Sequence, residues 1–406
     1  MKTLDEALKI LTSQAKEVEE LENVLVQEAL GRVLGRDALS LVNVPPLDNS
    51  QMDGYAVRAE DIKNPGQELE VSQRIPAGYL GKPLKENTVA RIFTGASVPE
   101  GANAIVMQEA CEVVQSEPTV RIRINEVPKA NQWIRRQGED LTANQVALKA
   151  GSYLRPQELG VAASGGLTHL TVKRKVKVSI FFTGDELALP GEVLKPGTIY
   201  NSNRDTLIAC LNSLGCEVTD FGIVPDSLEQ TRQTLRKAAK DSDLIITSGG
   251  VSVGEEDHVK PAVEAEGRLD MWQIAIKPGK PLAFGAVKKE NNKEAWFIGL
   301  PGNPVSSFVT FLLCVQPFIC ALQGRKNKPQ QSYLMRADFD WKKSDKRNEF
   351  LRVKVNEQGG LDLFPNQGSG VLTSAVWGDG LLDNPPMTMI NKGDLVKFIP
   401  FSSILI

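Results

Sequence analysis

The sequence has few of the residues that build metal centres and disulfide frameworks. It contains two histidines, His169 and His258, and five cysteines, no two of which are spaced as Cys-x-x-Cys. An odd number of cysteines cannot all pair, and zinc or His-rich sites need more closely spaced ligands. The composition therefore excludes a disulfide framework and such metal sites, and it indicates a reducing, cytoplasmic setting.

Long apolar segments and a strong net charge are also missing. The longest apolar run, 308–322, is interrupted by Gln316 and Pro317 and is shorter than the ~20 residues that cross a bilayer. Lys and Arg (47) nearly balance Asp and Glu (50), so no general field attracts nucleic acid or an acidic membrane. The N-terminus mixes charges with leucines, unlike a signal peptide. We therefore expect no nucleic-acid or membrane partner, and we interpret 308–322 as a buried helix.

The chain is long enough for several domains. Its 406 residues are 41% hydrophobic, which predicts roughly two to four domains with sizeable cores. Residues 1–34 show two helical patterns, and 55–128 contain short β-prone runs separated by Gly, Pro and Asn clusters, typical of a small antiparallel β domain. A helical piece begins near Pro156, and the basic segment after it is expected to return to the N-terminal arm.

The pattern changes after residue 175. Buried-type strands alternate with helices of 10–15 residues, which predicts βαβ units and a parallel sheet with helices on both faces. The strands are expected at 176–182, 217–224, 243–248 and 296–300, and the helices at 202–215, 227–242, 258–267 and 304–323. The short alternating runs of 330–406 favour a small β barrel or sandwich.

Candidate chemistry lies where these strands end, because ligands of open parallel sheets bind beyond the carboxyl ends of the strands. The third strand ends in TSGGVSVGEED (247–257), whose glycines allow backbone N–H groups to close on a phosphate. The two lysines of KPGKP (277–281) suit an oxyanion. A plain tight turn remains the alternative for the Gly-rich loop.

Four carboxylates are expected to converge on the same rim as Lys277 and Lys280. Acidic residues beside lysines and a Gly-rich loop suit a Mg²⁺ ion that bridges phosphate oxygens, which indicates a phosphoryl or nucleotidyl site. The alternative for Asp185 and Asp226 is that they are helix N-caps or turn residues. The four carboxylates are Asp185, Glu186, Asp226 and Asp257.

Eight long motifs follow one another over nearly the whole chain. They are PPLDNSQMDGYAV (45–57), RIFTGASVPEGANAIVMQE (91–109), RRQGEDL (135–141), FFTGDEL (181–187), IYNSNRDTL (199–207), DLIITSGGVSVGEED (243–257), IKPGKP (276–281) and GLPGNPVSS (299–307). Together they resemble the MoeA and gephyrin E-domain family of molybdopterin molybdenumtransferases.

The resemblance implies a multidomain α/β plus β fold in an L-shaped homodimer. The expected parts of each chain are an elongated arm (1–45 with 141–175), an inserted β-rich domain (46–140), a MogA/MoaB-like α/β domain that binds molybdopterin and nucleotide (176–327), and a C-terminal β barrel (328–406).

The resemblance also implies an activity. The expected substrates are adenylylated molybdopterin and molybdate, and AMP is released, with Mg²⁺, as the metal enters the dithiolene. A molybdopterin adenylyltransferase is the expected substrate donor, and molybdoenzymes or their chaperones are possible acceptors.

The resemblance implies roles for individual residues. The acidic residues of the nucleotide and Mg²⁺ site correspond to Glu186, Asp226 and Asp257. The loops that hold the phosphate and pterin correspond to Thr183, Gly184, Asp185, Ser248, Gly249, Gly250, Ser252, Gly254 and Pro301. The molybdate pocket corresponds to Lys277, Lys280, Pro281, Arg352 and Ser369. The residues that face the cleft of the other subunit correspond to Asp53, Thr94 and Asp140.

Two departures and two alternatives accompany the resemblance. Phe182 stands where relatives usually carry a small hydroxyl residue, and Gln273 stands where many carry Lys. The animal relative also clusters receptors, so a scaffold is the alternative from another class. Tungstate is a tetrahedral dianion like molybdate, and the motifs do not separate the two.

Overall fold

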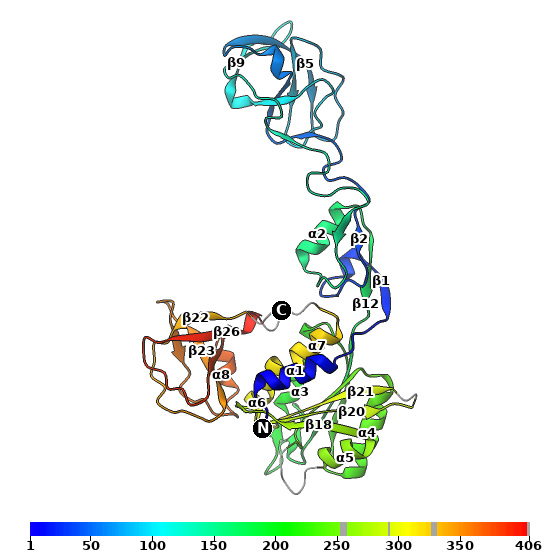
Figure 1. The fold of residues 1–406 in the computed structure, drawn as a ribbon, viewed down its shortest axis with the longest axis vertical. Coiled ribbons are helices and arrows are strands. Elements are labelled where there is room, and N and C mark those ends of the chain that lie inside the picture. The colour runs from blue at the N-terminus through cyan, green and yellow to red at the C-terminus, as the bar shows by residue number, and fades with distance from the viewer. Residues whose placement is uncertain (252–257, 291–292, 326–330, 404–406) are drawn as a thin grey trace.

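The computed structural model describes residues 1–251, 258–290, 293–325 and 331–403, without the side chains of Met271 and Trp272. The chain is elongated (Figure 1). The inserted domain, with β5 and β9, lies at one end of a narrow arm, and the α/β domain and the C-terminal domain lie side by side at the other end.

The arm combines the start of the chain with residues that follow the inserted domain. Helix α1 (Leu4–Gln14) begins at Thr3, whose side chain accepts from the backbone N–H of Glu6 in a capping box. The prediction of a second helix within residues 1–34 is wrong. Leu21–Leu25 form strand β1, which pairs with β12 (His169–Lys173), and a short 3₁₀ turn η1 (Val26–Glu28) follows. This pairing confirms that the chain returns to the arm.

The remaining elements of the arm are short. Helix α2 (Pro156–Ser164) has the predicted Pro in its first turn. Strand β2 (Ala38–Leu39) pairs with β11 (Val146–Leu148).

The inserted domain contains the predicted β-rich structure. Its six-stranded sheet has the order β7-β4-β6-β5-β9-β8, and only β5 and β6 pair in parallel. The strands are β4 (Gly54–Val57), β5 (Gln67–Ile75), β6 (Thr88–Ile92), β7 (Ala104–Met107), β8 (Cys111–Gln115) and β9 (Arg121–Ile124), with β3 (Asn49–Ser50) paired to β10 (Ile134–Arg135) and 3₁₀ turns η2 (Ala59–Asp61) and η3 (Gln108–Ala110).

The α/β domain has a six-stranded sheet of order β16-β13-β17-β21-β20-β18. The four predicted strands are parallel: β13 (Lys177–Thr183), β16 (Glu217–Val224), β17 (Leu244–Ser248) and β21 (Glu294–Leu300). Two strands that the sequence patterns did not indicate, β20 (Pro281–Lys288) and β18 (Gly267–Gln273), extend the sheet in antiparallel pairing.

Helices cover both faces of this sheet, as predicted. Alternate residues of β13 point to opposite sides, so Ile180 and Phe182 pack with α1, α3 (Ser202–Ser213) and the helix that starts at Pro304, whereas Phe181 packs with α4 (Leu228–Asp241) and α5 (Val259–Glu266).

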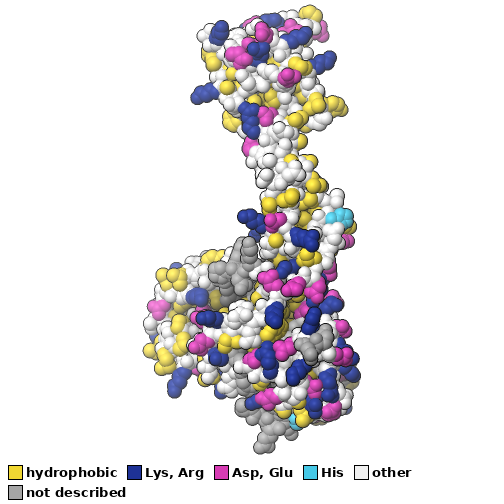
Figure 2. Space-filling model, turned by 45° about the vertical axis from the view of Figure 1, so that its right-hand side comes forward, with side chains coloured by type: hydrophobic (Ala, Val, Ile, Leu, Met, Phe, Trp, Pro, Cys, Tyr) yellow, Lys and Arg dark blue, Asp and Glu magenta, His cyan; other side chains and the backbone are white. Residues whose placement is uncertain are grey.

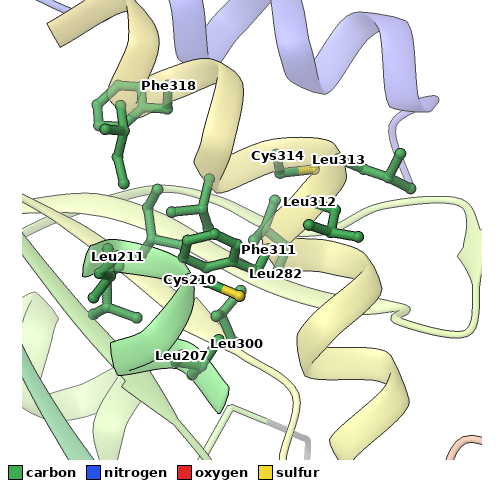
Figure 3. Close-up of a cluster of buried hydrophobic side chains, with 14 of the residues drawn as sticks. Leu207, Cys210, Leu211, Leu282, Leu300, Phe311, Leu312, Leu313, Cys314 and Phe318 are labelled. Atoms are coloured by element: carbon green, nitrogen blue, oxygen red, sulfur yellow. The ribbon is translucent and has the colours of Figure 1, made fainter. Parts of the chain in front are cut away.

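The apolar run 308–322 is a buried helix, as predicted. It continues α6 (Pro304–Thr310) through a π-helical segment (Phe311–Val315) into α7 (Gln316–Leu322). Pro317 lacks an N–H for the ordinary helical bond, which accounts for the irregular turn before it. The helix is long and apolar enough to span a membrane, but 78% of that window is buried inside the protein. Phe311 packs among Leu211, Leu282 and their neighbours (Figure 3).

The C-terminal domain has a mainly antiparallel sheet of order β19-β23-β25-β26-β22, with β24 attached to β23. Its first strand, β19 (Ile276–Lys277), comes from within the α/β sequence, between β18 and β20, and pairs in parallel with β23 (Asn348–Val355). The other elements are β22 (Tyr333–Arg336), β24 (Leu361–Leu363), α8 (Thr373–Trp377), β25 (Gly380–Asn384), β26 (Leu395–Pro400) and η5 (Phe401–Ser403). Among the described residues, the two end strands of this sheet, β19 and β22, do not pair with each other. The closed barrel therefore stays a prediction.

Candidate active site

A cavity of about 640 Å³ lies between the carboxyl edge of the α/β sheet and the C-terminal domain. Such a volume accommodates a ligand of cofactor size. Eleven residues implied by the family resemblance line it: Thr183, Gly184, Glu186, Asp226, Gly249, Gly250, Lys277, Lys280, Pro281, Pro301 and Ser369.

The parallel strands deliver most of these residues. Thr183 ends β13, Gly249 directly follows β17, and Pro301 directly follows β21. Asp226 lies two residues beyond the end of β16. Because the strands run parallel, their carboxyl ends meet at one edge, and side chains far apart in sequence come together there.

One side of the cavity is acidic. The backbone N–H of Asp226 donates to Oδ1 of Asp185 (3.3 Å), and Glu186 and Asp226 both line the cavity. Burial raises the pKa of the Asp226 carboxyl, and the nearby Asp185 and Glu186 raise it further. Ser227 is the N-cap of α4, so the interpretation of Asp226 as an N-cap is wrong.

Three predicted residues lie outside the described residues: Asp257 of the acidic site, and Ser252 and Gly254 of the Gly-rich loop. Within the described ranges, no group of three or more His, Cys, Asp or Glu side chains is arranged to hold a metal ion.

The Gly-rich loop approaches the neighbouring strand end closely. Gly249 has a φ of +97°, and a Cβ at this position would collide with the carbonyl oxygen of Thr183. The Thr183 hydroxyl is buried and has no hydrogen-bond partner within the part of the chain that the structure describes. The Gly249 backbone therefore lines the cavity, and the buried Thr183 hydroxyl lies close to it.

Ser248 does not line the cavity. Its hydroxyl donates to the carbonyl oxygen of Pro301 (2.9 Å) and accepts from the Asn203 amide (2.9 Å). The same amide also donates to the carbonyl oxygen of Gly302 (2.7 Å). Ser248 and Asn203 thus join two strand-end loops behind the cavity wall.

Another part of the cavity is basic. The ammonium of Lys277 lies 3.0 Å from Glu349 Oε1 and 3.2 Å from Asp345 Oδ2. Burial disfavours its charge, but the hydrogen bonds to Glu349 and Asp345 outweigh burial and raise the pKa of Lys277. Lys280 is exposed, and its ammonium has no ion-pair partner among the described residues.

The sequence interpretation missed a cation in this wall. Arg347 lines the cavity and lies just before the strand predicted from EFLRVKV. Its Nε and Nη2 donate to the two oxygens of Asp345 at 3.0 and 2.9 Å. The only sequence signal for Arg347 was its Asp-x-Arg spacing from Asp345. Ion pairs of this kind are common on protein surfaces, so the spacing does not indicate a binding site. Asn303, Ser306, Gln367 and Gly368 also line the cavity without having been named.

Arg352 lies behind the cavity wall instead of in it. Its side chain is 1% exposed, and it donates to Ser374 Oγ (3.0 Å) and to the carbonyl oxygens of Phe350 (3.1 Å) and Gly368 (3.3 Å). Burial lowers the pKa of Arg352 to about 10. Gly368 and Ser369 line the cavity, so Arg352 contacts the loop that carries the predicted Ser369.

Three predicted residues, Asp53, Thr94 and Asp140, lie in the inserted domain or at its junction with the arm, away from the cavity of their own chain. Oδ1 of Asp53 accepts from the backbone N–H and the hydroxyl of Thr94, both at 2.8 Å, and these bonds lower the pKa of Asp53. Asp53 precedes β4 and Thr94 follows β6, so the pair belongs to the inserted domain, at the far end of the arm (Figure 1). Asp140 lies where the chain re-enters the arm, with its N–H bonded to the Val44 carbonyl oxygen (2.9 Å).

Phe182 and Gln273, the two residues that depart from the family pattern, do not line the cavity. Phe182 is buried in the core of the α/β domain. Gln273 ends β18, where it pairs with Pro281.

The fold and the cavity define a class: multidomain α/β proteins with a polar ligand site at the carboxyl edge of a doubly covered sheet. The family models narrow this class. Residues 2–166 match the MoeA N-terminal region (domains I and II), 179–321 match a probable molybdopterin binding domain, and 335–401 match the MoeA C-terminal region (domain IV).

Individual relatives agree with these models. The chain is 40% identical to a molybdopterin molybdenumtransferase of Haemophilus influenzae over all of both chains. It is 36% identical to one of Nostoc, with 86% of this chain and 80% of that one covered. A MoeA crystal structure from Pyrococcus horikoshii has a TM-score of 0.85 at 28% identity, covering 99% of this chain and 100% of that one. The chain therefore belongs to the molybdopterin molybdenumtransferase family, and it is a transferase of molybdenum cofactor biosynthesis.

Proposed function

We propose that this enzyme inserts molybdate into adenylylated molybdopterin in a Mg²⁺-dependent reaction that releases AMP and leaves molybdenum bound to molybdopterin. The observation that supports this most strongly is the separation of charge within one cavity. Glu186 and Asp226 line one part, and Lys277, Lys280 and Arg347 line another. A substrate with a nucleotide phosphate and a second, oxyanionic substrate need this combination of groups.

The acidic part suits a divalent cation bound to phosphate. Mg²⁺ commonly takes one or two carboxylates and completes its coordination with water and phosphate oxygens. Glu186 and Asp226 meet this requirement. Burial, and then the like charges of Asp185 and Glu186, raise the pKa of Asp226, and a cation would offset those like charges. We propose Glu186, Asp226 and Asp257 as the magnesium residues. The ion would stabilise charge on the phosphate as the bond to AMP breaks.

The loop at Gly249 suits the phosphate itself. Its backbone lies in the cavity wall close to the buried Thr183 hydroxyl, which has no hydrogen-bond partner among the described residues, and backbone N–H groups of such loops bind phosphate oxygens well. We therefore assign Thr183, Gly249 and Gly250 to the adenylylated substrate.

The basic part suits molybdate, a tetrahedral dianion. Cationic donors form hydrogen bonds with oxyanions that are roughly twice as strong as neutral ones. Lys277 is held in place by two carboxylates, and Lys280 is exposed at the cavity. Ser369 adds a hydroxyl from the C-terminal domain.

We propose that the enzyme is a cytoplasmic homodimer. Exposed apolar side chains concentrate along the arm (Figure 2) and would be covered by a second copy. They are Leu21, Leu25, Leu30, Leu39, Leu41, Val42 and Val146. In such a dimer, Asp53 and Thr94 of one chain would reach the cavity of the other, and Asp140 belongs to the same group. A molybdopterin adenylyltransferase would supply the substrate.

The test is AMP release from adenylylated molybdopterin by the purified protein. We expect release to require both Mg²⁺ and molybdate. Release that is independent of molybdate, or no release by folded dimer, would contradict the proposal. Replacing molybdate with tungstate in the same assay measures the preference between the two oxyanions.

A further inference from the structure

We infer that Arg74 and Arg91 of the inserted domain, with Phe93 beside them, form a phosphate-binding subsite next to Asp53 and Thr94. The ligand is the phosphate of the adenylylated substrate, bound in the cavity of a second copy of the chain. This inference rests on the proposed function, because there the inserted domain of one chain reaches the cavity of the other.

The two arginines lie directly opposite each other. Arg74 of β5 and Arg91 of β6 are register partners on neighbouring parallel strands, so their side chains project from the same face of the sheet, where like charges destabilise it. No carboxylate forms an ion pair with either guanidinium among the described residues. The paired arginines of this domain are instead Arg58, Arg123 and Arg136. A bound anion would offset the repulsion between Arg74 and Arg91.

Arg91 is held in place by hydrogen bonds and connected to Asp53. Its Nη1 donates to the carbonyl oxygens of Gly54 (2.8 Å) and Ile92 (3.2 Å), and its Nη2 donates to Gln108 Oε1 (2.6 Å). The backbone N–H of Gln108 in turn donates to the Asp53 carbonyl oxygen (3.0 Å). Nε of Arg91 has no hydrogen-bond partner in the described part of the chain. Arg91 can therefore bind an anion with little loss of side-chain entropy.

Phe93 brings both cations close to the Asp53–Thr94 pair. The guanidinium carbons of Arg74 and Arg91 lie 4.6 and 4.5 Å from the centre of its ring, and Phe93 directly precedes Thr94. After the hydrogen bonds from Thr94, the charge of Arg91 also contributes to the low pKa of Asp53. Arg74 is exposed and makes no hydrogen bond within the described ranges. Its guanidinium is thus available to a ligand that reaches Asp53.

The cavity explains why a second chain would supply these cations. The cationic side chains that line it, Lys277, Lys280 and Arg347, all belong to its basic part. No lysine or arginine among the described lining residues comes from the strand-end loops that carry Glu186 and Asp226. Guanidinium groups bind phosphate through charge-assisted hydrogen bonds. Arg74 and Arg91 would provide such groups for the phosphate, in addition to Mg²⁺.

The experiment measures AMP release by the full-length protein, first with varied adenylylated molybdopterin and then with varied molybdate. Arg74→Ala is the main variant, because it removes a charge without removing a hydrogen bond. We expect KM for adenylylated molybdopterin to rise roughly three- to tenfold, as for the loss of one exposed charge-assisted contact. The value of kcat should stay within about twofold of wild type, and the half-saturating molybdate concentration should not change.

Two further variants separate charge from structure. Arg74→Lys keeps the charge and should restore KM to within about twofold of wild type. Arg91→Ala should raise KM and also lower kcat, because the backbone around Asp53 loses its support. Arg123→Ala is the matched control, since Arg123 lies in the same sheet but is already paired with Glu68 and Glu112. It should leave KM within about twofold of wild type.

The outcomes distinguish this inference from the proposed function. If the wild-type protein releases no AMP, the proposed function fails. If the wild type is active and Arg74→Ala has a normal KM for adenylylated molybdopterin, only the inference fails. A rise in the half-saturating molybdate concentration without a rise in KM would also overturn it, because the arginines would then bind the other anion. Melting curves confirm that each variant is folded. Should Arg74→Ala be unstable, Arg74→Gln must raise KM at least about threefold.

Discussion

At the scale of single residues, the Asp226 carboxyl is a source of instability in the free protein. Its pKa is raised by burial and by two neighbouring carboxylates. A carboxyl with a raised folded pKa binds its proton more tightly in the folded state, so its ionised form destabilises the fold. The destabilisation is absent below the unfolded pKa and complete above the folded pKa.

We therefore expect Asp226→Asn to melt at a higher temperature than wild type near pH 7 while losing AMP release. The difference in melting temperature should shrink as the pH falls toward the raised pKa of Asp226. Thermal melts from pH 5 to 8 without Mg²⁺ provide the measurement. Asp205→Asn is the control, because Asp205 is an exposed partner of Arg204 and its loss should not raise the melting temperature. If the stability gain of Asp226→Asn grew as the pH fell, the ionised Asp226 carboxylate would not be the destabilising form.

The two lysines of the oxyanion site should differ in their structural importance. Lys277 neutralises Glu349, a carboxylate that is 1% exposed, whereas Lys280 is exposed and has no ion pair among the described residues. We expect Lys277→Ala to lower the free energy of unfolding by about 1–3 kcal/mol, because a buried charge loses its partner. Lys280→Ala should change it by less than about 0.5 kcal/mol.

Both lysine variants should still raise the molybdate concentration needed for half-maximal AMP release. Urea melts and molybdate titrations distinguish the two effects. Equal stabilities of the two variants would contradict the assigned importance of the Lys277–Glu349 pair.

At the scale of elements, the α/β domain was predictable where the sequence pattern was regular. The parallel strands β13, β17 and β21 are largely apolar runs, and β16, at the edge of the sheet, is more polar. Their alternation with helices is a clear local signal of a parallel sheet. The carboxyl ends of these strands meet at one edge of the sheet, so the sequence alone indicates Thr183, Asp226 and Gly249 as residues of the cavity.

Elements that depend on distant partners were not predictable in the same way. Leu21–Leu25 was predicted as helix because its charges and leucines fit a helical spacing, but pairing with β12 decides its structure. β18 and β20 are interrupted by Gly and polar residues, and they join the sheet only through β21. Arg347 was missed for a similar reason, because the C-terminal domain brings it to the cavity through β19 and β23.

Helix α3 illustrates how one element fixes several loops. The amide of Asn203, in its first turn, donates to Ser248 Oγ and to the Gly302 carbonyl oxygen. We expect Asn203→Ala to lower the free energy of unfolding by about 1–3 kcal/mol, because a buried hydroxyl and a carbonyl lose a donor. AMP release should fall as well, since the loops at Gly249 and Pro301 lose their common support.

Asn212→Ala is the matched control, because Asn212 is an exposed asparagine in the same helix. It should change stability by less than about 0.5 kcal/mol. Normal stability and AMP release in Asn203→Ala would contradict the proposed support of the two loops.

At the scale of the whole molecule, the predicted catalytic residues form two groups, one in the inserted domain and one at the cavity. The two groups are far apart within one chain. Asp53 and Thr94 lie in the inserted domain, and the cavity lies beyond the other end of the arm (Figure 1). The bond from Thr94 keeps the Asp53 carboxylate ionised and oriented without any contribution from the cavity of its own chain. If both sets act in one reaction, a second chain must supply one of them.

Subunit mixing tests this arrangement. We expect Asp53→Asn and Asp226→Asn homodimers to be inactive, because every cleft carries one defect. In a mixed dimer, one cleft would receive both substitutions and the other neither. A one-to-one mixture with random exchange contains mixed dimers as about half of its population, so it should recover about a quarter of wild-type AMP release. Exchange must be verified with differently tagged subunits. If the exchanged mixture stays inactive, Asp53 serves its own chain or acts structurally, and each active site is built from a single subunit.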